Sequence, residues 1–355
     1  MKILRINIVL PFPVTKPVGG AKIMYEYANR LQEAGHTVII LHSIKRPYKK
    51  TSAPVWFDQL VYALRGVARP KWFTLHKEIR SVIVPEITEK YVPDGDIVFC
   101  TWWEMAYMIN ALPASKGKKI NLIQDYETWK GGATIVDNSF SLPITHVVIA
   151  KYLSELVTEK SGIAPLYLPN AIDTTKFYVN TPIEKRDPLS ILMLYSQEER
   201  KGTVYGVQAI EKIKEIYPNI VVSFFGVYKR PDDLPHWIDY LQRPDNLCAL
   251  YNQHAVFFSP SLAEGWALPP AEAMACGCAV VCTNIGGHQD YAVDNETALL
   301  AAPKNITAMV TQLTLLLEDN NKRIALAIAG NQHIIKKSSW DRSVTDLLHI
   351  FNGSL

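Results

Sequence analysis

The chain has 355 residues, of which 48% are apolar and 20% charged, and its formal net charge is +3. This length is sufficient for two domains with separate cores. No segment contains the roughly 18 uncharged apolar residues that a membrane-spanning helix needs, and Met1-Lys2 leads directly into an apolar strand rather than into a cleavable signal. The five cysteines lie mostly in apolar runs, which disfavours a disulfide framework and fits a reducing cytoplasm.

The first elements form a β-loop-α-β unit. Residues 3–10 are typical of a buried strand, a loop follows over 13–20, and the next segment carries apolar residues at helical spacing until Gly35 ends it. A second strand is predicted over 37–41. Gly19-Gly20 would then lie at the start of the helix, where backbone amides can face a phosphate, although a glycine pair is more often only a turn.

The segment 43–80 is strongly basic, with nine Lys or Arg against Asp58 and Glu78 and a net charge of +7. Mixed cationic and aromatic side chains suit the headgroup region of an anionic membrane, which is the partner that we favour over an ordinary solvated loop. No nucleic-acid-binding motif accompanies the segment, so we expect no nucleic-acid partner. The aromatic residues of the segment are Tyr48, Trp56, Phe57, Tyr62, Trp72 and Phe73.

Three further strands are predicted over 96–100, 120–123 and 146–149. The first is followed by Thr101-Trp102-Trp103-Glu104 and the second by Gln124-Asp125-Tyr126-Glu127. In parallel α/β sheets the carboxyl ends of strands bind ligands, so Glu104, Asp125 and Glu127 are candidate site residues, with capping or solvated acids as the alternative.

Asp94 and Asp96 have the spacing of a metal-binding acid pair. They lie in Pro93-Asp94-Gly95-Asp96, which is typical turn chemistry, and we interpret them as structural. We therefore predict no metal requirement.

A second alternation of strands and helices starts after Pro188, with strands predicted over 189–194, 219–225, 255–258 and 279–282. The loop after the first of these strands contains Arg200-Lys201-Gly202 and opens a helix. Later helices are expected from Asn305 and Asn320, and a closing helix over 340–351. The fold class predicted for the whole chain is α/β.

Two glutamates separated by seven residues follow the strand 255–258. Glu264 is expected on the loop and Glu272 about one turn into a helix, because Pro269-Pro270 fit a first helical turn. Acceptor-only carboxylates, loop amides and a helix N-terminus together can hold sugar hydroxyls and a diphosphate, which describes a nucleotide-sugar site. The alternative is an acidic helix start stabilised by the helix dipole. The nearby Cys276, Cys278 and Cys282 are interpreted as packed thiols rather than metal ligands.

The stretch from Ala263 to Gly277 resembles the E-x7-E element of family 4 retaining glycosyltransferases. Pro169 to Phe177 is similar to the linker of that family, and Lys201-Gly202, Gly286-Gly287 and Asn295 to Leu300 fall in register with it. The resemblance implies the GT-B fold: two Rossmann-like domains with parallel sheets facing across a cleft, and a C-terminal helix that returns to the first domain. It implies an acceptor domain over 1–170 plus 338–355 and a donor domain over 171–337.

The resemblance also implies residue roles. Lys201 would stabilise the leaving phosphate, Glu264 would bind donor-sugar hydroxyls, Glu272 the ribose diol, and Asp125 would act at the reacting centre. Glu104 and Glu127 are acceptor-side candidates. The remaining donor-binding candidates are Gly20, Arg200, Gly265, Trp266, Ala267 and Leu268.

Two positions depart from the family pattern. Ser196 stands where many members have arginine, and Gln124 where they commonly have histidine. The sequence Gln-Asp-Tyr-Glu from Gln124 onward looks more like that of bacterial rhamnan-type and O-antigen polysaccharide glycosyltransferases. Arg200 is a candidate substitute for the missing arginine.

The activity implied is metal-independent, retaining transfer of a hexose from a nucleoside-diphosphate sugar to a saccharide or lipid-linked acceptor, in polysaccharide or lipopolysaccharide synthesis. No cofactor besides the donor substrate is expected. The protein would be cytoplasmic, peripheral at the inner face of the membrane through 43–80. A GT-B nucleotide-sugar epimerase and a catalytically silent nucleotide-sugar-binding subunit are the alternatives.

Overall fold

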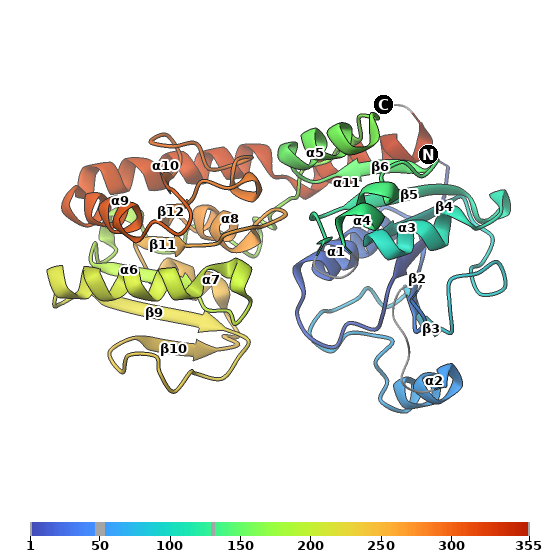
Figure 1. Cartoon of the computed structure of the whole chain (residues 1–355), viewed down its shortest axis with the longest axis horizontal. Coiled ribbons are helices and arrows are strands. Elements are labelled where there is room, and N and C mark those ends of the chain that lie inside the picture. Colours follow the sequence, from blue (N-terminus) through green and yellow to red (C-terminus); the bar gives the residue numbers. More distant parts are fainter. Residues whose placement is uncertain (1, 47–53, 129–131, 354–355) are drawn as a thin grey trace. The chain divides into compact units, whose positions relative to one another are not determined.

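The computed structural model describes residues 2–46, 54–128 and 132–353. The chain divides into two compact units (Figure 1). Unit 1 comprises Met1–Asn170 and Asp341–Leu355, and unit 2 comprises Ala171–Trp340.

Unit 1 is built on a seven-stranded parallel sheet with the strand order β3-β2-β1-β4-β5-β6-β7. Its central strands are buried on both faces, as expected for a parallel sheet covered by helices. The strands are β1 (Arg5–Leu10), β2 (Thr37–Ser43), β3 (Arg80–Val84), β4 (Ile97–Thr101), β5 (Lys118–Ile123), β6 (Thr145–Val148) and β7 (Leu166–Tyr167). The helices are α1 (Gly19–Glu33), α2 (Val55–Leu64), α3 (Trp103–Asn110), α4 (Ala133–Ser139), α5 (Lys151–Ser161) and α11 (Trp340–Asn352), with the short 3₁₀ helix η1 (Ala114–Lys116).

The C-terminal helix α11 packs on unit 1, which confirms the predicted return of the chain. The Phe351 ring lies 5.7 Å from that of Phe99 on β4. Lys118 on β5 donates to the carbonyl of Ile350 over 2.6 Å. The last helix is therefore part of the core that the first 170 residues build.

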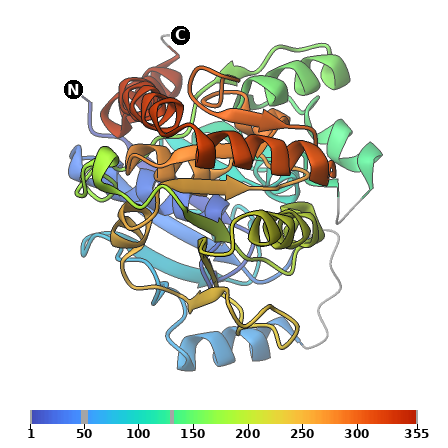
Figure 2. The ribbon, with the colours of Figure 1, turned by 90° about the vertical axis from the view of Figure 1, so that its left-hand side faces the viewer.

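Unit 2 has a six-stranded parallel sheet with the order β10-β9-β8-β11-β12-β13, and Figure 2 turns this unit toward the viewer. Helices α6 and α9 pack together, and α10 contacts α8 and β12. The strands are β8 (Ser190–Leu194), β9 (Val221–Gly226), β10 (Asp239–Gln242), β11 (Val256–Ser259), β12 (Ala279–Thr283) and β13 (Leu299–Ala301). The helices are α6 (Thr203–Ile216), α7 (Leu247–Asn252), α8 (Leu268–Ala275), α9 (Ile306–Glu318) and α10 (Asn320–Lys337), with the 3₁₀ helices η3 (Ile183–Lys185), η4 (Glu199–Lys201) and η5 (Gly286–His288).

The acid pair Asp94 and Asp96 has structural partners. Asp96 accepts from the backbone N–H of Arg5 over 2.8 Å and pairs with Lys2, while Asp94 pairs with Lys116 at 2.8 Å. Asp96 thereby links the chain before β4 to the start of β1, and Asp94 links it to η1, which precedes β5.

Gly117 provides a test of this local structure, because a side chain there would collide with the backbone. Its φ is +97°, and an added Cβ would lie 2.3 Å from the carbonyl carbon of Asp96. Gly35 has a similar φ of +89° with nothing within 4 Å, so it serves as the matched control. We expect Gly35→Ala to lower the free energy of unfolding by about 1–2 kcal/mol. Gly117→Ala should cost about 3 kcal/mol or more in urea denaturation; equal costs would contradict the clash.

Candidate active site

The loop from β11 to α8 and the helix α8 that follows it carry the two glutamates of the E-x7-E element. Glu264 lies on the loop, and Glu272 is the fifth residue of α8, as predicted from the prolines of its first turn. Both side chains are buried, with 8% and 4% of their surface exposed. Two carboxylic acids removed from water need partners, and the structure supplies a different one to each.

Lys201 reaches the site from η4, which follows the neighbouring strand β8. Gly202 ends η4 with a φ of +63°, and an added Cβ there would lie 2.0 Å from the carbonyl oxygen of Pro260. The carbonyl of Arg200 accepts from Leu262 N–H over 2.7 Å. These close backbone contacts hold the loop after β8 against the loop after β11.

Lys201 and Glu264 form a bidentate ion pair. The Lys201 ammonium donates to both carboxylate oxygens over 2.8 Å each, and the Ser261 hydroxyl donates to Oε1 over 2.8 Å. Burial by itself would raise the pKa of Glu264, but the charge and hydrogen bonds of Lys201 outweigh it and the pKa is lowered. Glu264 is therefore a fixed carboxylate with an ammonium beside it.

Arg200 is oriented differently from Lys201. Its guanidinium pairs with Glu198 at 2.9 Å, and both side chains are well exposed. Ser196 contributes to the same turn, since its backbone N–H donates to Thr203 Oγ1 and its hydroxyl accepts from Glu198 N–H. The role predicted for Arg200 stays a prediction.

Glu272 is held by Tyr251, a residue to which the sequence analysis gave no role. The Tyr251 hydroxyl donates to Glu272 Oε2 over 3.2 Å, and its ring packs edge-on against Phe225 and Phe257. Burial followed by the charge of Glu272 raises the pKa of Tyr251 far above its usual value, so the hydroxyl remains a donor. The only signal in the sequence was an aromatic residue in an otherwise apolar segment.

The residues between the two glutamates are fixed by η5 and the residues that follow it. Ala267 N–H donates to the Gly287 carbonyl, and the Tyr291 hydroxyl donates to the Ala267 carbonyl over 2.8 Å. The Trp266 ring lies 4.9 Å from that of Tyr291. Its indole N–H is buried and has no hydrogen-bond partner among the described residues. Gly265 and Leu268 complete this segment, and Leu268 begins α8.

A pocket of unit 2 contains the ion pair. Lys201 and Glu264 line it together with Leu194 at the end of β8 and Pro269 and Pro270 at the start of α8. Cation, carboxylate and helix start thus converge at the carboxyl end of the sheet, where α/β folds bind ligands.

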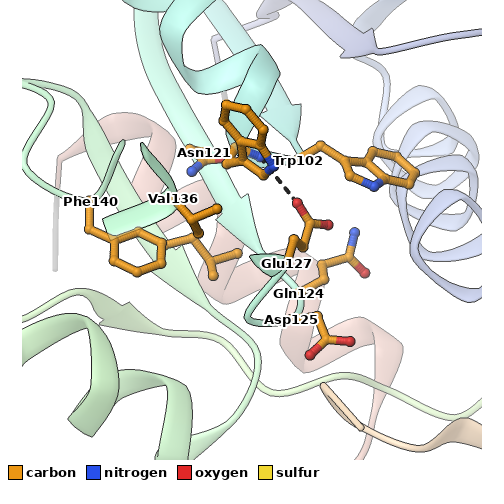
Figure 3. Close-up of a pocket in the computed structure, with 9 residues that line it drawn as sticks. Trp102, Asn121, Gln124, Asp125, Glu127, Val136 and Phe140 are labelled. Carbon is orange, nitrogen blue, oxygen red and sulfur yellow. Dashed lines mark hydrogen bonds between the residues drawn. The ribbon is translucent and has the colours of Figure 1, made fainter. Parts of the chain in front are cut away.

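Unit 1 has its own pocket at the carboxyl ends of β4 and β5 (Figure 3). Asp125, Glu127 and Gln124 line it with Trp102 and Trp103. Glu127 Oε2 accepts from the backbone N–H of Trp103 over 3.2 Å. Trp102 has a φ of +71°, an uncommon conformation for a residue with a bulky side chain. The structure thus brings the predicted Asp125 and Glu127 together.

Gln124 joins this pocket to the start of α1. Its Nε2 donates to the Gly20 carbonyl and to Thr101 Oγ1, each over 3.0 Å. The Thr101 hydroxyl donates its own proton to the Leu122 carbonyl. Since both acceptors require an N–H, the orientation of the amide is settled and Oε1 is its acceptor end.

Glu104 does not line this pocket. It pairs with Arg46 over 3.6 Å, and both side chains are almost fully buried. The Arg46 guanidinium also lies 5.2 Å from the centre of the Phe12 ring. The acceptor role predicted for Glu104 stays a prediction.

Comparison with known proteins agrees with this architecture. Residues 180–333 match the family described as glycosyl transferases group 1. The chain is 33% identical over 117 residues to O-antigen chain mannosyltransferase B of Escherichia coli, covering 32% of this chain and 30% of the relative. It is 21% identical over 369 residues to the phosphatidyl-myo-inositol mannosyltransferase of Mycolicibacterium smegmatis, covering 98% and 93%. The alignments with three relatives of 32–34% identity each span less than a third of the relative's own length.

Among solved structures, the Anabaena Alr3699/HepE protein in complex with UDP-glucose aligns with a TM-score of 0.75 at 12% identity, over 99% of this chain and all of that one. The chain therefore has the GT-B fold, and its match to the group 1 glycosyl transferases lies within unit 2. The family and the relatives are those of glycosyltransferase enzymes. None of the described helices is long and apolar enough to cross a bilayer.

The ion pair predicts a pH dependence. Because the folded-state pKa of Glu264 lies below its unfolded value of about 4.5, its stabilising contribution is complete above that pH and is lost as the pH falls through the folded pKa. In urea denaturation from neutral to acidic pH, Glu264→Gln should flatten the acid-side fall of the free energy of unfolding. Glu215→Gln, an exposed acid on α6, is the control and should follow the wild type. A Glu264→Gln profile with the wild-type slope would contradict the lowered pKa.

Proposed function

We propose that the protein is a family 4 retaining glycosyltransferase. It transfers a hexose from a nucleoside-diphosphate sugar to a saccharide or lipid-linked acceptor during synthesis of a bacterial cell-surface polysaccharide. The observation that carries the proposal is the buried Lys201–Glu264 pair on the loops that also position Glu272. The names of the two mannosyltransferase relatives support a hexose donor and a polysaccharide or lipid acceptor.

In this proposal unit 2 holds the donor. Glu272, oriented by Tyr251, accepts hydrogen bonds from the ribose hydroxyls, and Glu264 accepts from hydroxyls of the donor sugar. Lys201 lies beside Glu264 before the donor arrives, and the diphosphate then competes for its ammonium protons. The positive charge of Lys201 and the N-terminus of α8 offset the negative charge that develops on the leaving diphosphate. No divalent metal is needed for this step.

The configuration at the anomeric carbon is retained if the leaving diphosphate and the incoming acceptor hydroxyl are on the same face of the donor sugar. The bond from the anomeric carbon to the diphosphate oxygen breaks, and the acceptor hydroxyl bonds to that carbon from the same side. Its proton passes to the departing phosphate. In unit 1 the carboxylates of Asp125 and Glu127 accept hydrogen bonds from hydroxyl groups of the acceptor substrate. Trp102 and Trp103 offer apolar faces to a sugar ring.

Two alternatives use the same donor site. An epimerase would release a changed nucleotide sugar without an acceptor, and a silent binding subunit would bind donor without turnover. Because an epimer has the same mass as its parent nucleotide sugar, proton NMR of the nucleotide sugar together with mass analysis of the acceptor, after incubation with and without saccharide acceptors, separates the three. A product that requires the acceptor supports the transferase.

The donor site can be tested by thermal unfolding with UDP, dTDP, GDP, ADP and NAD, using wild type and Glu272→Ala. A ligand at about a hundred times its dissociation constant adds roughly 2.7 kcal/mol of stability. We expect one nucleoside diphosphate to raise the melting temperature of the wild type and not that of Glu272→Ala. Glu296→Ala, an exposed acid of the same unit, is the control and should respond like the wild type. Stabilisation by NAD alone, or by none of the five, would refute the proposal.

We also propose that α2 brings the protein to an anionic membrane surface, at the inner face of the membrane. Trp56, Leu60 and Leu64 recur every four residues, which places them on one face of α2, and they are 67%, 51% and 80% exposed. None of the residues of α2 is buried, and Figure 1 shows the helix at the edge of unit 1 near β3. The exposed cations Arg65 and Lys71 follow it closely in the chain.

The proposed membrane-binding surface includes fewer residues than the sequence analysis expected from the whole segment 43–80. Trp72 and Phe73 pack inside unit 1, with their rings 5.8 and 5.5 Å from that of Tyr25. Arg46 pairs with Glu104, and Arg69 donates to backbone carbonyls. Tyr48, Lys49 and Lys50 lie outside the described residues. Trp56 was among the predicted aromatic residues, whereas Leu60 and Leu64 on the same exposed face of α2 were not.

Vesicle sedimentation tests this surface. The full-length protein should bind vesicles of mixed phosphatidylcholine and phosphatidylserine, and less strongly vesicles of phosphatidylcholine alone. Replacing Trp56 and Leu60 together by serine should lower the partition coefficient at least about tenfold, since each buried apolar side chain contributes about 1.5–3 kcal/mol. Ile163→Ser removes an equally exposed apolar side chain elsewhere in unit 1 and should leave binding unchanged. Equal loss in both variants, or no binding by the wild type, would overturn this assignment.

A further inference from the structure

Two cysteines of unit 2 face each other beside Glu272. Cys248 lies on α7 and Cys276 directly after α8, and their sulfur atoms are 3.8 Å apart. Cys276 is fully buried, while Cys248 is partly exposed. The pair therefore has one sulfur that a reagent in solution can reach and a second sulfur in contact with it.

The same two helices are joined a second time by the donor-site contact. Tyr251 lies about one turn after Cys248 on α7, and Glu272 lies one turn before Cys276 on α8. Arg186 braces this region, donating to Asn252 Oδ1 over 3.0 Å and also to the Cys276 carbonyl. The Cys248–Cys276 contact and the Tyr251–Glu272 contact are thus neighbouring links between one pair of helices.

We propose that Cys248 and Cys276 form a reversible disulfide that weakens binding at the Glu272 site. This proposal rests on the assignment of Glu272 to the nucleotide. Disulfides in cytosolic proteins are usually transient and often sense the redox state. None of the other described cysteines has this arrangement: Cys100 and Cys282 lie in strands, and Cys278 Sγ is directed to the Tyr251 and His254 carbonyls.

The chemistry is thiol–disulfide exchange with a low-molecular-mass disulfide as the oxidant. The Cys248 thiolate attacks one sulfur of the reagent and forms a mixed disulfide with it. The first thiolate of the reagent leaves and takes up a proton. The Cys276 thiolate then attacks the Cys248 sulfur and expels the second thiolate of the reagent, which also takes up a proton. Two protein thiols are oxidised and one disulfide is reduced to two thiols. Burial raises the pKa of the Cys276 thiol, which lowers the fraction present as the attacking thiolate.

Closing the bond draws the two cysteines together, by rotation of their side chains and by movement of α8 against α7. A disulfide sets the two sulfurs about 2.05 Å apart, against 3.8 Å in the thiol form. Tyr251 is fully buried among Phe177, Phe225 and Phe257 and is not free to follow the movement. The hydroxyl of Tyr251 and the carboxylate of Glu272 should therefore lose their alignment.

The experiment uses the full-length protein, reduced or treated with glutathione disulfide. Peptide mass analysis should find Cys248 linked to Cys276, with the linkage lost after dithiothreitol. Nucleotide affinity, measured by calorimetry with the nucleoside diphosphate that stabilises the reduced protein, should fall about tenfold on oxidation. It should recover on reduction.

Cysteine variants test whether the response to oxidant depends on Cys248 and Cys276 rather than on another thiol. Cys248→Ser and Cys276→Ala should each abolish the linkage and the response to oxidant. Testing both variants keeps the experiment informative if one of them fails to fold. Cys282→Ala removes a buried thiol of the same unit and should respond like the wild type. Absence of the linked peptide, or a linked protein with unchanged affinity, would overturn the inference. If the reduced protein binds none of the nucleotides, the proposed function fails, while the peptide mapping still decides whether the disulfide forms.

Discussion

The ion pair between Lys201 and Glu264 is the interaction on which the candidate site depends. It exists because β8 and β11 are adjacent parallel strands, so the loops that leave their carboxyl ends meet. Gly202 and the Arg200 carbonyl let those loops approach until backbone touches backbone. Buried pairs add little net stability over apolar packing, yet leaving one partner alone costs about 3–5 kcal/mol. The pair therefore makes each loop dependent on the other.

The two glutamates illustrate how one segment yields two environments. Glu264 faces a cation and remains ionised, whereas Glu272 faces the hydroxyl of Tyr251, which is held as a donor by burial. The hydrogen bond from Tyr251 helps to hold the Glu272 carboxylate in one orientation, and a carboxylate has several acceptor sites on its two oxygens. A side chain that already has its binding orientation reduces the entropy that is lost when a substrate binds.

Much of the fold follows from local pattern. The central strands are apolar runs, Pro269 and Pro270 set the start of α8, and these were predicted correctly. Contacts between distant segments were not predicted: Glu264 and Lys201 were both named, but their pairing depends on strand order. Tyr251 lies in no motif, and although Glu104 was named as a candidate, nothing in the sequence indicates that it pairs with Arg46. The edge strands β3, β7 and β10 escaped prediction because they are short or only partly buried.

The fixed amide of Gln124 has a consequence for ligand chemistry. Both of its N–H groups are committed to Gly20 and Thr101, so toward a ligand it presents an oxygen and no proton. A sugar hydroxyl can meet that oxygen with its hydrogen, but an O-methyl or O-acetyl group would set two lone-pair-bearing oxygens against each other. If unit 1 binds the acceptor as proposed, this oxygen would distinguish bare sugars from their alkylated or acylated derivatives by polarity as well as by size, so such groups would have to be added after the transfer.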